Sequence, residues 1–447
     1  MAQTADTPSP SVDPGQRSNH SALMIVFLVV FIDLLGFGIV LPMLPRIAKS
    51  YLSHIIAETE PTTIGAVTGL LMSSFSLMQF LFAPAWGRLS DRIGRRPVLL
   101  VGLFGSVVFY TLFGFAASEP SDYHTAIIAV TLFFVARIGA GISGATISTA
   151  QAVIADSTPP DKRKHGMALI GAAFGIGFTF GPLIGFGCVS LSEAMPSIGL
   201  GSIGYSAAIL SFIALLLALR LLPETRVAGA ESTVRRNLID ASGIRFALAN
   251  PALGPIILIF FLSSLGFGAF EVTLSVFLQD IFSLNEQYSF LFFAYVGFVL
   301  MLTQGFLYRR LASRVSEVTF IAMGICFMAV GVGLQGAICY AVAKQVYDAE
   351  ALKPVLVIAL TAAVVGFAFL TPSAQALVSR RTPSDRQGEI LGVNQSASAL
   401  ARILGPLFGM ILYQAHPTHI LPYIAGAVLL VLMLPLLPRI RRMDSER

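Results

Sequence analysis

Residues 22 to 45, ALMIVFLVVFIDLLGFGIVLPMLP, form an apolar run whose only charged residue is Asp33. A helix rises about 1.5 Å per residue, so a run of this length can cross the ~30 Å hydrocarbon core of a bilayer. A transmembrane β-strand would alternate apolar and polar residues over about 10 positions, and this run does not alternate. It therefore predicts a membrane-spanning α-helix.

Similar runs recur along the whole chain. The 447 residues are 55% hydrophobic and only 12% charged, whereas a soluble domain carries about 25% charged residues. We predict an all-α integral membrane protein with twelve transmembrane helices. Their expected spans are residues 22–45, 63–86, 98–118, 124–155, 166–187, 202–222, 252–280, 288–308, 317–341, 355–378, 388–414 and 420–438.

The basic residues predict the orientation of these helices, because cytoplasmic loops retain Lys and Arg. With the N-terminus inside, the inner segments hold 23 basic residues and the outer loops hold four, Arg46, Lys49, Lys344 and Lys353. Both termini are therefore expected on the cytoplasmic side of a cell membrane. The net charge of +5 follows from this topology and does not require a nucleic-acid partner.

The two ends of the chain are expected to be polar cytoplasmic segments. Residues 1–21 are rich in Pro, Ser and Thr, which predicts disorder. They do not resemble a cleaved signal, because the apolar run that follows is too long and no small-residue cleavage site comes after it. Residues 439–447 form the other tail.

An internal duplication is present. Residues 150–185 align without a gap on residues 374–409, an offset of 224, and the two segments share Ala-Gln-Ala, Thr-Pro-x-Asp and Gly-Pro-Leu-x-Gly. The Leu-Gly-Phe-Gly at 35–38 in the first span likewise returns at 265–268 in the seventh. Matches at equivalent helices in the same order indicate two related halves.

The duplication divides the chain into two six-helix bundles. We place them at residues 22–222 and 251–438, joined by a cytoplasmic linker at 223–250. Parallel repeats related by an axis along the membrane normal are one of the two common plans of transporters. We therefore expect the protein to move small solutes across a bilayer.

The loop after the second span reads Gly87-Arg-Leu-Ser-Asp91-Arg92-Ile-Gly94-Arg95-Arg96. A merely basic inner loop would explain its arginines but not the glycines and the acid at those spacings. The pattern resembles the loop signature of the major facilitator superfamily. The resemblance implies that Asp91, Arg92 and Arg95 latch the two bundles together on the inner side in one state. The acid is expected to face the N-terminal end of helix 388–414, whose partial positive charge favours it.

Two further motifs resemble this family. Arg137, in Ala-Arg-Ile-Gly-Ala-Gly-Ile-Ser-Gly at 136–144, lies near the middle of the membrane, where a buried arginine is costly and needs a partner. The resemblance implies that it modulates proton release from a nearby acid; the alternative is a structural tie to Asp33 or to a backbone carbonyl. The fifth span resembles the antiporter motif, in which small residues permit close helix packing. Its positions here are Gly171, Gly175, Gly177, Gly181, Pro182 and Gly185.

The first span closely resembles that of tetracycline and multidrug efflux carriers. An isolated carboxylate such as Asp33 favours its protonated form in a low-dielectric environment, so it can carry a proton. The alternative is a permanent ion pair with Arg137 or Arg402. The span 317–341, where tetracycline carriers place an important acid, has none between Thr319 and Tyr340, which argues against tetracycline as the substrate.

Glu271 and Arg402 complete the charges at membrane depth. In the repeat they align with Leu41 and Phe178, so each of these charges is present in only one of the two halves. Ionisable groups at this depth are functional candidates by default. We expect Asp33 and Glu271 to exchange the proton, with Arg137 and Arg402 tuning them.

These features predict a proton-coupled antiporter that exports amphipathic small molecules. Its cavity is expected between the spans at 22–45, 124–155, 252–280 and 355–378. The partners are protons, the bilayer and a small molecule, and the protein is expected to act as a monomer. No cofactor other than the proton gradient and no metal is expected. The residues expected to line the cavity are Asp33, Gln151, Glu271, Gln375 and Asn394.

Other classes of function remain as alternatives. A facilitator or importer of sugars or organic anions is the strongest rival, and a non-transporting membrane sensor or scaffold is another. An ATP-driven pump is disfavoured because the chain lacks a Gly-x4-Gly-Lys-Ser/Thr loop. An enzyme is not expected, since neither His-Glu-x2-His nor Gly-x-Ser-x-Gly occurs.

Overall fold

The computed structural model describes the backbone of residues 20–57, 59–117, 122–158, 163–195, 198–225, 241–383 and 386–445. Within these ranges the side chains of 20–22, 33, 155, 163–172, 174, 241–244, 388 and 443–445 are not described. The expected disorder of residues 1–21 and most of the linker 223–250 fall outside the described residues.

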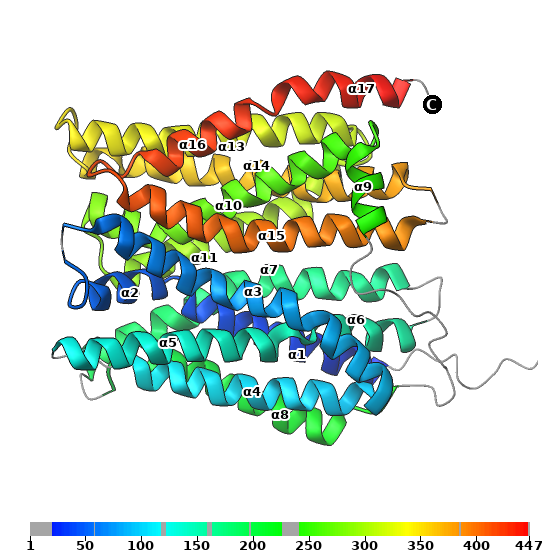
Figure 1. Ribbon diagram of the computed structural model, residues 1–447, viewed down its shortest axis with the longest axis horizontal. Coiled ribbons are helices and arrows are strands. Elements are labelled where there is room, and N and C mark those ends of the chain that lie inside the picture. Colours follow the sequence, from blue (N-terminus) through cyan, green and yellow to red (C-terminus); the bar gives the residue numbers. More distant parts are fainter. Residues whose placement is uncertain are drawn as a thin grey trace, which may run out of the picture.

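The described chain is helical (Figure 1). The first half contains α1 His20–Val40, α2 Leu44–Leu52, α3 Pro61–Ile93, α4 Arg95–Ala116, α5 Tyr123–Ser143, η2 Gly144–Thr146, α6 Ile147–Asp156, α7 Arg163–Ala194 and α8 Ser202–Leu221. A short helix, α9 Ala241–Ala249, follows. The second half contains α10 Gly254–Phe282, α11 Glu286–Leu302, η3 Thr303–Tyr308, α12 Arg309–Leu311, α13 Glu317–Ala343, η4 Glu350–Leu352, α14 Lys353–Arg381, α15 Gln387–Gln414, α16 Leu421–Val431, η6 Leu434–Leu436 and α17 Leu437–Ser445.

The prediction of twelve transmembrane helices is confirmed. Twelve helical segments of the described chain are long and apolar enough to cross a membrane, from Leu23–Val40 to Leu421–Arg442. The first of them is shorter than predicted. Pro42 has no N–H to donate, and the chain turns at residues 41–43 before α2 begins with Pro45 in its first turn. Arg46 and Lys49, expected in an outer loop, therefore lie on a separate helix.

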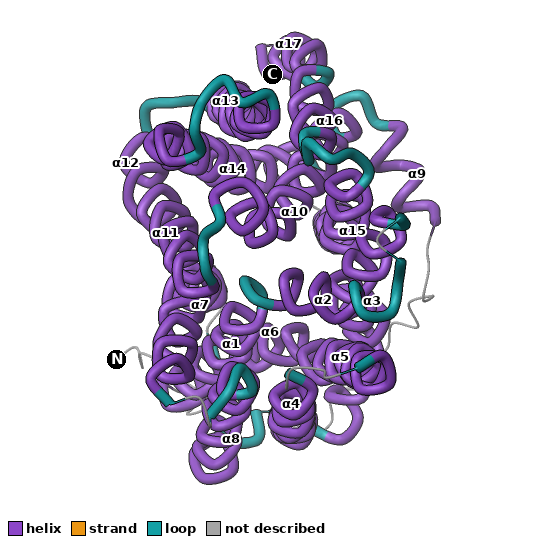
Figure 2. Tube along the Cα trace, turned by 90° about the vertical axis from the view of Figure 1, so that its left-hand side faces the viewer, coloured by secondary structure: helices purple, strands orange, loops and turns teal. Residues whose placement is uncertain are grey.

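The helices form two groups that lie side by side (Figure 1). We call α1–α8 the N-half and α10–α17 the C-half. The halves meet along two pairs of helices, α3 with α15 and α7 with α11. Seen end-on, α2 lies between the two groups (Figure 2). We call this end of the molecule the α2 end and the opposite end, where α9 lies, the α9 end.

Glycines set the closest helix crossings, and the two halves use equivalent ones. A Cβ added at Gly181 of α7 would stand 2.9 Å from the Cα of Gly38 in α1. In the C-half, a Cβ added at Gly405 of α15 would stand 2.8 Å from the carbonyl oxygen of Leu265 in α10. The repeated Gly-Pro-Leu-x-Gly segments therefore make the same kind of contact twice, each against the first helix of its own half.

Candidate functional site

A cavity of about 40 Å³ lies between the two halves. Helices α1, α3 and α5 of the N-half and α10 and α15 of the C-half contribute to its wall. The shape and the access of a cavity bounded by two groups of helices change when one group moves against the other. Its lining residues are Phe37, Leu41, Met72, Ser76, Arg137, Gly268, Glu271, Val272, Arg402 and Pro406.

Arg137 is the most unusual residue of this wall. Its side chain is only 2% exposed, and neither Nε nor Nη1 has a hydrogen-bond partner among the described residues. The guanidinium lies 4.6 Å from the ring centre of Phe75 and 5.7 Å from that of Phe37, so aromatic faces supply part of its stabilisation. Cation–π contacts leave the N–H groups unsatisfied, and a buried donor without an acceptor is costly.

Glu271 and Arg402 face the same cavity from the C-half. They are close enough to interact electrostatically, but the described chain contains no ion pair within 4.0 Å between them. Taking a lone charge out of water is expensive. Three ionisable groups in this wall, with no ion pair among them in the described chain, make the cavity the candidate functional site.

The structure places the other predicted cavity residues differently. The side chain of Asp33 lies outside the described residues. Gln151, Gln375 and Asn394 are not among the residues that line the cavity, and α14 contributes none. Asn394 is buried, with an Oδ1 that has no partner among the described residues. The structure brings Glu271, Arg137 and Arg402 to one cavity wall, to which α3 and α15 also contribute.

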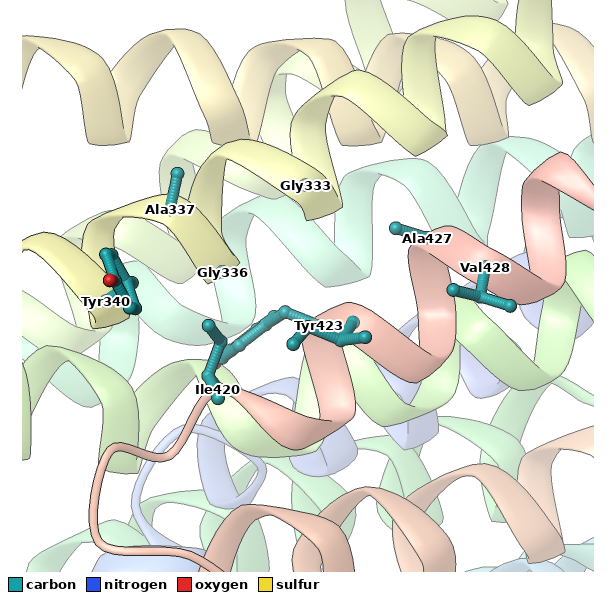
Figure 3. Close-up of a pocket in the computed structure, with 9 residues that line it drawn as sticks. Gly333, Gly336, Ala337, Tyr340, Ile420, Tyr423, Ala427 and Val428 are labelled. Carbon is teal, nitrogen blue, oxygen red and sulfur yellow. The ribbon is translucent and has the colours of Figure 1, made fainter.

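A larger groove of about 340 Å³ lies between α13 and α16 (Figure 3). Its wall carries no acidic or basic side chain, and Tyr340, Ile424 and Val428 are exposed on the outer surface of the bundle. A groove of this kind on a membrane-spanning surface suits lipid chains. We therefore place the candidate functional site at the charged cavity and not at the larger groove.

The loop motif at 87–96 folds as a hinge between α3 and α4. Gly94 ends α3 with φ +108°, a conformation that only glycine adopts readily. The backbone N–H groups of Arg95 and Arg96 then donate to the carboxylate of Glu224, at 2.9 and 3.2 Å. An acid at the first residues of a helix is stabilised by the partial positive charge there. Glu224, which lies in the predicted linker, is thus a hydrogen-bond partner of this motif.

The charged residues of the motif pair within one half. Arg95 pairs with Asp91 at 2.5 Å and with Asp156 at 3.2 Å, and all three residues belong to the N-half. The predicted contact between Asp91 and the N-terminal end of α15 is not among the contacts of the described residues. The predicted latch between the halves remains a prediction for another conformation.

We expect Gly94→Ala to lower the free energy of unfolding by about 1 to 3 kcal/mol. The alanine would need a strained backbone angle, and its Cβ would collide with the carboxylate of Glu224. Thermal unfolding in detergent measures the loss. Gly87→Ala is the matched control in the same motif, since its Cβ would find its nearest neighbour, Ser148 Oγ, at 3.7 Å. Equal unfolding of the two variants would contradict this role of Gly94.

The glycines of the fifth span face two partners. Gly177 and Gly181 pack against α1, where a Cβ at Gly177 would stand 2.9 Å from Leu34 Cβ. A Cβ at Gly185 would collide with the ring of Phe290 in α11 of the C-half, and one at Gly175 would touch Met301 at 3.8 Å. Gly171 lies outside the residues whose surroundings are described. The motif therefore packs α7 within its own half and also against the other half.

Comparison with known proteins decides the family. The model of the Major Facilitator Superfamily matches residues 26–343 and 327–446, which is nearly the whole chain. The chain belongs to the major facilitator superfamily. It is a multi-pass membrane transporter, and the family resemblance of the loop motif is confirmed.

Similar proteins include both bacterial and mammalian superfamily members. The chain is 31% identical over 401 residues to the class E tetracycline resistance protein of Escherichia coli, with 89% of each chain covered. It is 27% identical over 441 residues to the major facilitator superfamily domain-containing protein 10 of Mus musculus, covering 91% of this chain and 90% of that relative. The crystal structure of the human organic anion transporter MFSD10 shares the fold, with a TM-score of 0.63, 24% identity, and coverage of 94% and 100%.

Proposed function

We propose that this superfamily member is a secondary transporter that exports amphipathic small molecules in exchange for protons by alternating access. The observation that carries the proposal is the charged cavity between the halves, which Glu271, Arg137 and Arg402 all line. The similarity to tetracycline resistance proteins supports export of a drug-like molecule.

Glu271 is the proton carrier in this proposal. An ionised carboxylate at membrane depth needs compensation, and Arg402 supplies it through space without a direct contact. A basic group on the substrate and a proton both neutralise the same carboxylate, so they compete for it. Competition of this kind couples export of one to import of the other. Apart from Ser76 and the three charged residues, the side chains that line the cavity are apolar. The apolar part of the substrate packs against these side chains.

The structure supports one half of the alternating-access cycle. At the α2 end the halves pack closely, since a Cβ at Gly65 of α3 would stand 2.5 Å from the carbonyl oxygen of Met410 in α15. Ser73 of α3 also donates to the carbonyl of Ile403 at 2.5 Å. Gly392, near the start of α15 at the other end, would find no neighbour for an added Cβ. With the predicted orientation, this conformation is closed to the outside.

Transport in liposomes tests the proposal. A thermal-shift screen over drugs, dyes, sugars and organic anions selects a fluorescent probe that binds. Purified protein in liposomes should then accumulate the probe when a pH gradient is imposed, and collapse of the gradient should abolish accumulation. Binding without movement of the probe would instead favour a sensor or scaffold. The same assay on Asp33→Asn tests the predicted role of Asp33.

A facilitator or importer of organic anions is the second candidate, and Arg137 favours it. Its Nε and Nη1 have no partner among the described residues, so each can donate a charged hydrogen bond to an anionic substrate. The structural similarity to MFSD10 shows the fold alone, but that protein is described as an organic anion transporter. In this alternative the substrate binds the arginines and no proton is exchanged.

Arg137→Gln separates the two candidates. If the substrate is an organic anion, fluorescein binding should weaken by roughly 10- to 100-fold, because a charged hydrogen bond contributes about 1.5–3 kcal/mol. Downhill fluorescein flux should not need a pH gradient. Arg310→Gln is the matched control, since Arg310 also lies over a phenylalanine, Phe306 at 6.0 Å, but lines no part of the cavity. Equal fluorescein binding in both variants would exclude the anion site.

A further inference from the structure

The α2 end is joined by ion pairs that cross between the halves. The only two basic residues of α2, Arg46 and Lys49, both reach acids of the C-half. These are two of the four basic residues that are expected on the outer side, against the general trend. The ion pairs with Glu286 and Asp280 explain why positive charge is present on this side.

Arg46 makes the more buried of the two contacts. Its side chain is 7% exposed, yet it pairs with Glu286 at 3.1 Å and donates to the carbonyl of Leu284 and to Ser289 Oγ at 3.2 and 3.0 Å. All three partners lie at or next to the start of α11. Burial lowers the pKa of Arg46, an effect that Glu286 and then Asp280 oppose. The guanidinium therefore depends on the C-half for its charge partners.

Lys49 makes the second contact. Its Nζ lies 2.7 Å from one carboxylate oxygen of Asp280 and 2.8 Å from the other. Asp280 also accepts a hydrogen bond from Tyr413 at 3.2 Å, and His419 Nε2 lies 3.9 Å away. Asp280 is therefore held by α15 and by the loop before α16, so Lys49 binds a carboxylate that the C-half positions in advance.

A third contact between the halves lies at the same end. Gln287 at the start of α11 donates to Glu193 at the end of α7, at 2.5 Å. Two of these contacts are made by α2, which lies between the two groups of helices (Figure 2), and the third joins α11 to α7. None of them belongs to the loop motif at 87–96, which lies at the α9 end.

We propose that Arg46 and Lys49 of α2, with Glu286 and Asp280 of the C-half, form a gate that closes the α2 end and must separate when the transporter opens there. We call these four residues the α2 gate. The inference rests on alternating access in the proposed function, but not on proton coupling or on the direction of transport.

The connection between α1 and α2 makes the gate movable. The turn at residues 41–43 separates α2 from α1, so α2 can rotate without bending the transmembrane helix. Its contacts within the N-half are with α3 and α5. Ion pairs are suited to a gate because opening replaces them with water, which solvates the separated charges. An apolar contact of the same size would expose hydrophobic surface instead.

Reversal and exchange of charge test the gate. The reporter is Ser76→Cys, a cavity residue of α3, in a background in which Cys188, Cys326 and Cys339 are replaced. A membrane-impermeant maleimide is added from the α2 side of oriented proteoliposomes. Asp280→Lys places a second positive charge beside Lys49, and the repulsion destabilises the closed state. The rate of labelling should therefore increase roughly tenfold or more. The double variant Lys49→Asp with Asp280→Lys should return the labelling rate to within about threefold of the parent.

The exchange variant also shows that the altered chain folds. Glu350→Lys is the matched control, because Glu350 pairs with Lys353 at 2.6 Å within the C-half, where a reversal should leave labelling unchanged. If Asp280→Lys lowers expression, the neutral variants Lys49→Met and Asp280→Asn replace it. Their labelling rates should also increase, by less than that of Asp280→Lys. Unchanged labelling in Asp280→Lys, or an exchange variant that labels as fast as the single reversal, would overturn the gate. The readout needs no substrate, so a failed gate and a failed export assay are separate results.

Discussion

Glu271→Gln should abolish accumulation driven by a pH gradient while leaving downhill movement of the same probe. Glutamine keeps the shape and the hydrogen-bonding capacity of the side chain but cannot take up or release a proton. One proton per cycle across about one pH unit supplies roughly 1.4 kcal/mol, which sustains a substrate gradient of about tenfold. The variant should lose this gradient entirely and fall to the level of protein-free liposomes.

The measurement compares two modes of the same protein. Accumulation is followed under an imposed pH gradient, and exchange of labelled for unlabelled probe is followed without a gradient. Glu350→Gln is the matched control, since Glu350 is an exposed acid outside the cavity. Wild-type accumulation in Glu271→Gln would remove Glu271 from proton coupling. Loss of exchange as well as accumulation would show that substrate binding itself depends on the negative charge of Glu271.

Gly181→Leu should leave the protein in the membrane but reduce transport strongly. The added side chain meets backbone atoms of Gly38 at 2.9 and 3.0 Å and the carbonyl oxygen of Leu35 at 3.0 Å. Backbone atoms cannot move aside as a flexible side chain can, so α7 must shift away from α1. Overpacking of this kind costs about 1–3 kcal/mol. Because α7 also packs against α11, the shift reaches the boundary between the halves.

The control for this prediction lies on the same helix. Gly187 finds no neighbour within 4 Å for an added Cβ, so Gly187→Leu should transport normally. The Ala variants at both positions should rank in the same order with smaller effects. Membrane content is measured by quantitative blotting and transport by the liposome assay. Full activity in Gly181→Leu would show that the close approach of α7 and α1 is incidental to the cycle.

The internal duplication explains why these two predictions concern different kinds of residue. Gly181 and Gly405 occupy equivalent positions and make equivalent crossings, so they belong to the frame shared by both halves. Glu271 and Arg402 have neutral counterparts in the other half, and both line the cavity. The residues shared by both halves build two bundles that can move against each other. The charged residues present in only one half are the candidates for proton and substrate binding.

Some of the candidate site could be predicted from sequence because charge at membrane depth is rare. Arg137, Glu271 and Arg402 were identified in this way, and all three line one cavity. Gln151, Gln375 and Asn394 are also polar residues within spans, but a helix has several faces, and these three residues do not line the cavity. Glu224 and Asp280 were missed because an acid near the end of a span has water as an ordinary partner.

What the sequence determines by itself is the membrane architecture: twelve spans, two related halves and membership of the superfamily. These follow from local properties, since a helix must satisfy its own backbone in lipid and needs about 20 apolar residues to cross it. Only the tertiary structure decides that Arg46 meets Glu286, that Lys49 meets Asp280 and that Arg137 lies against the rings of Phe37 and Phe75. These contacts join residues from different helices, and their geometry depends on how the helices pack and how the halves dock.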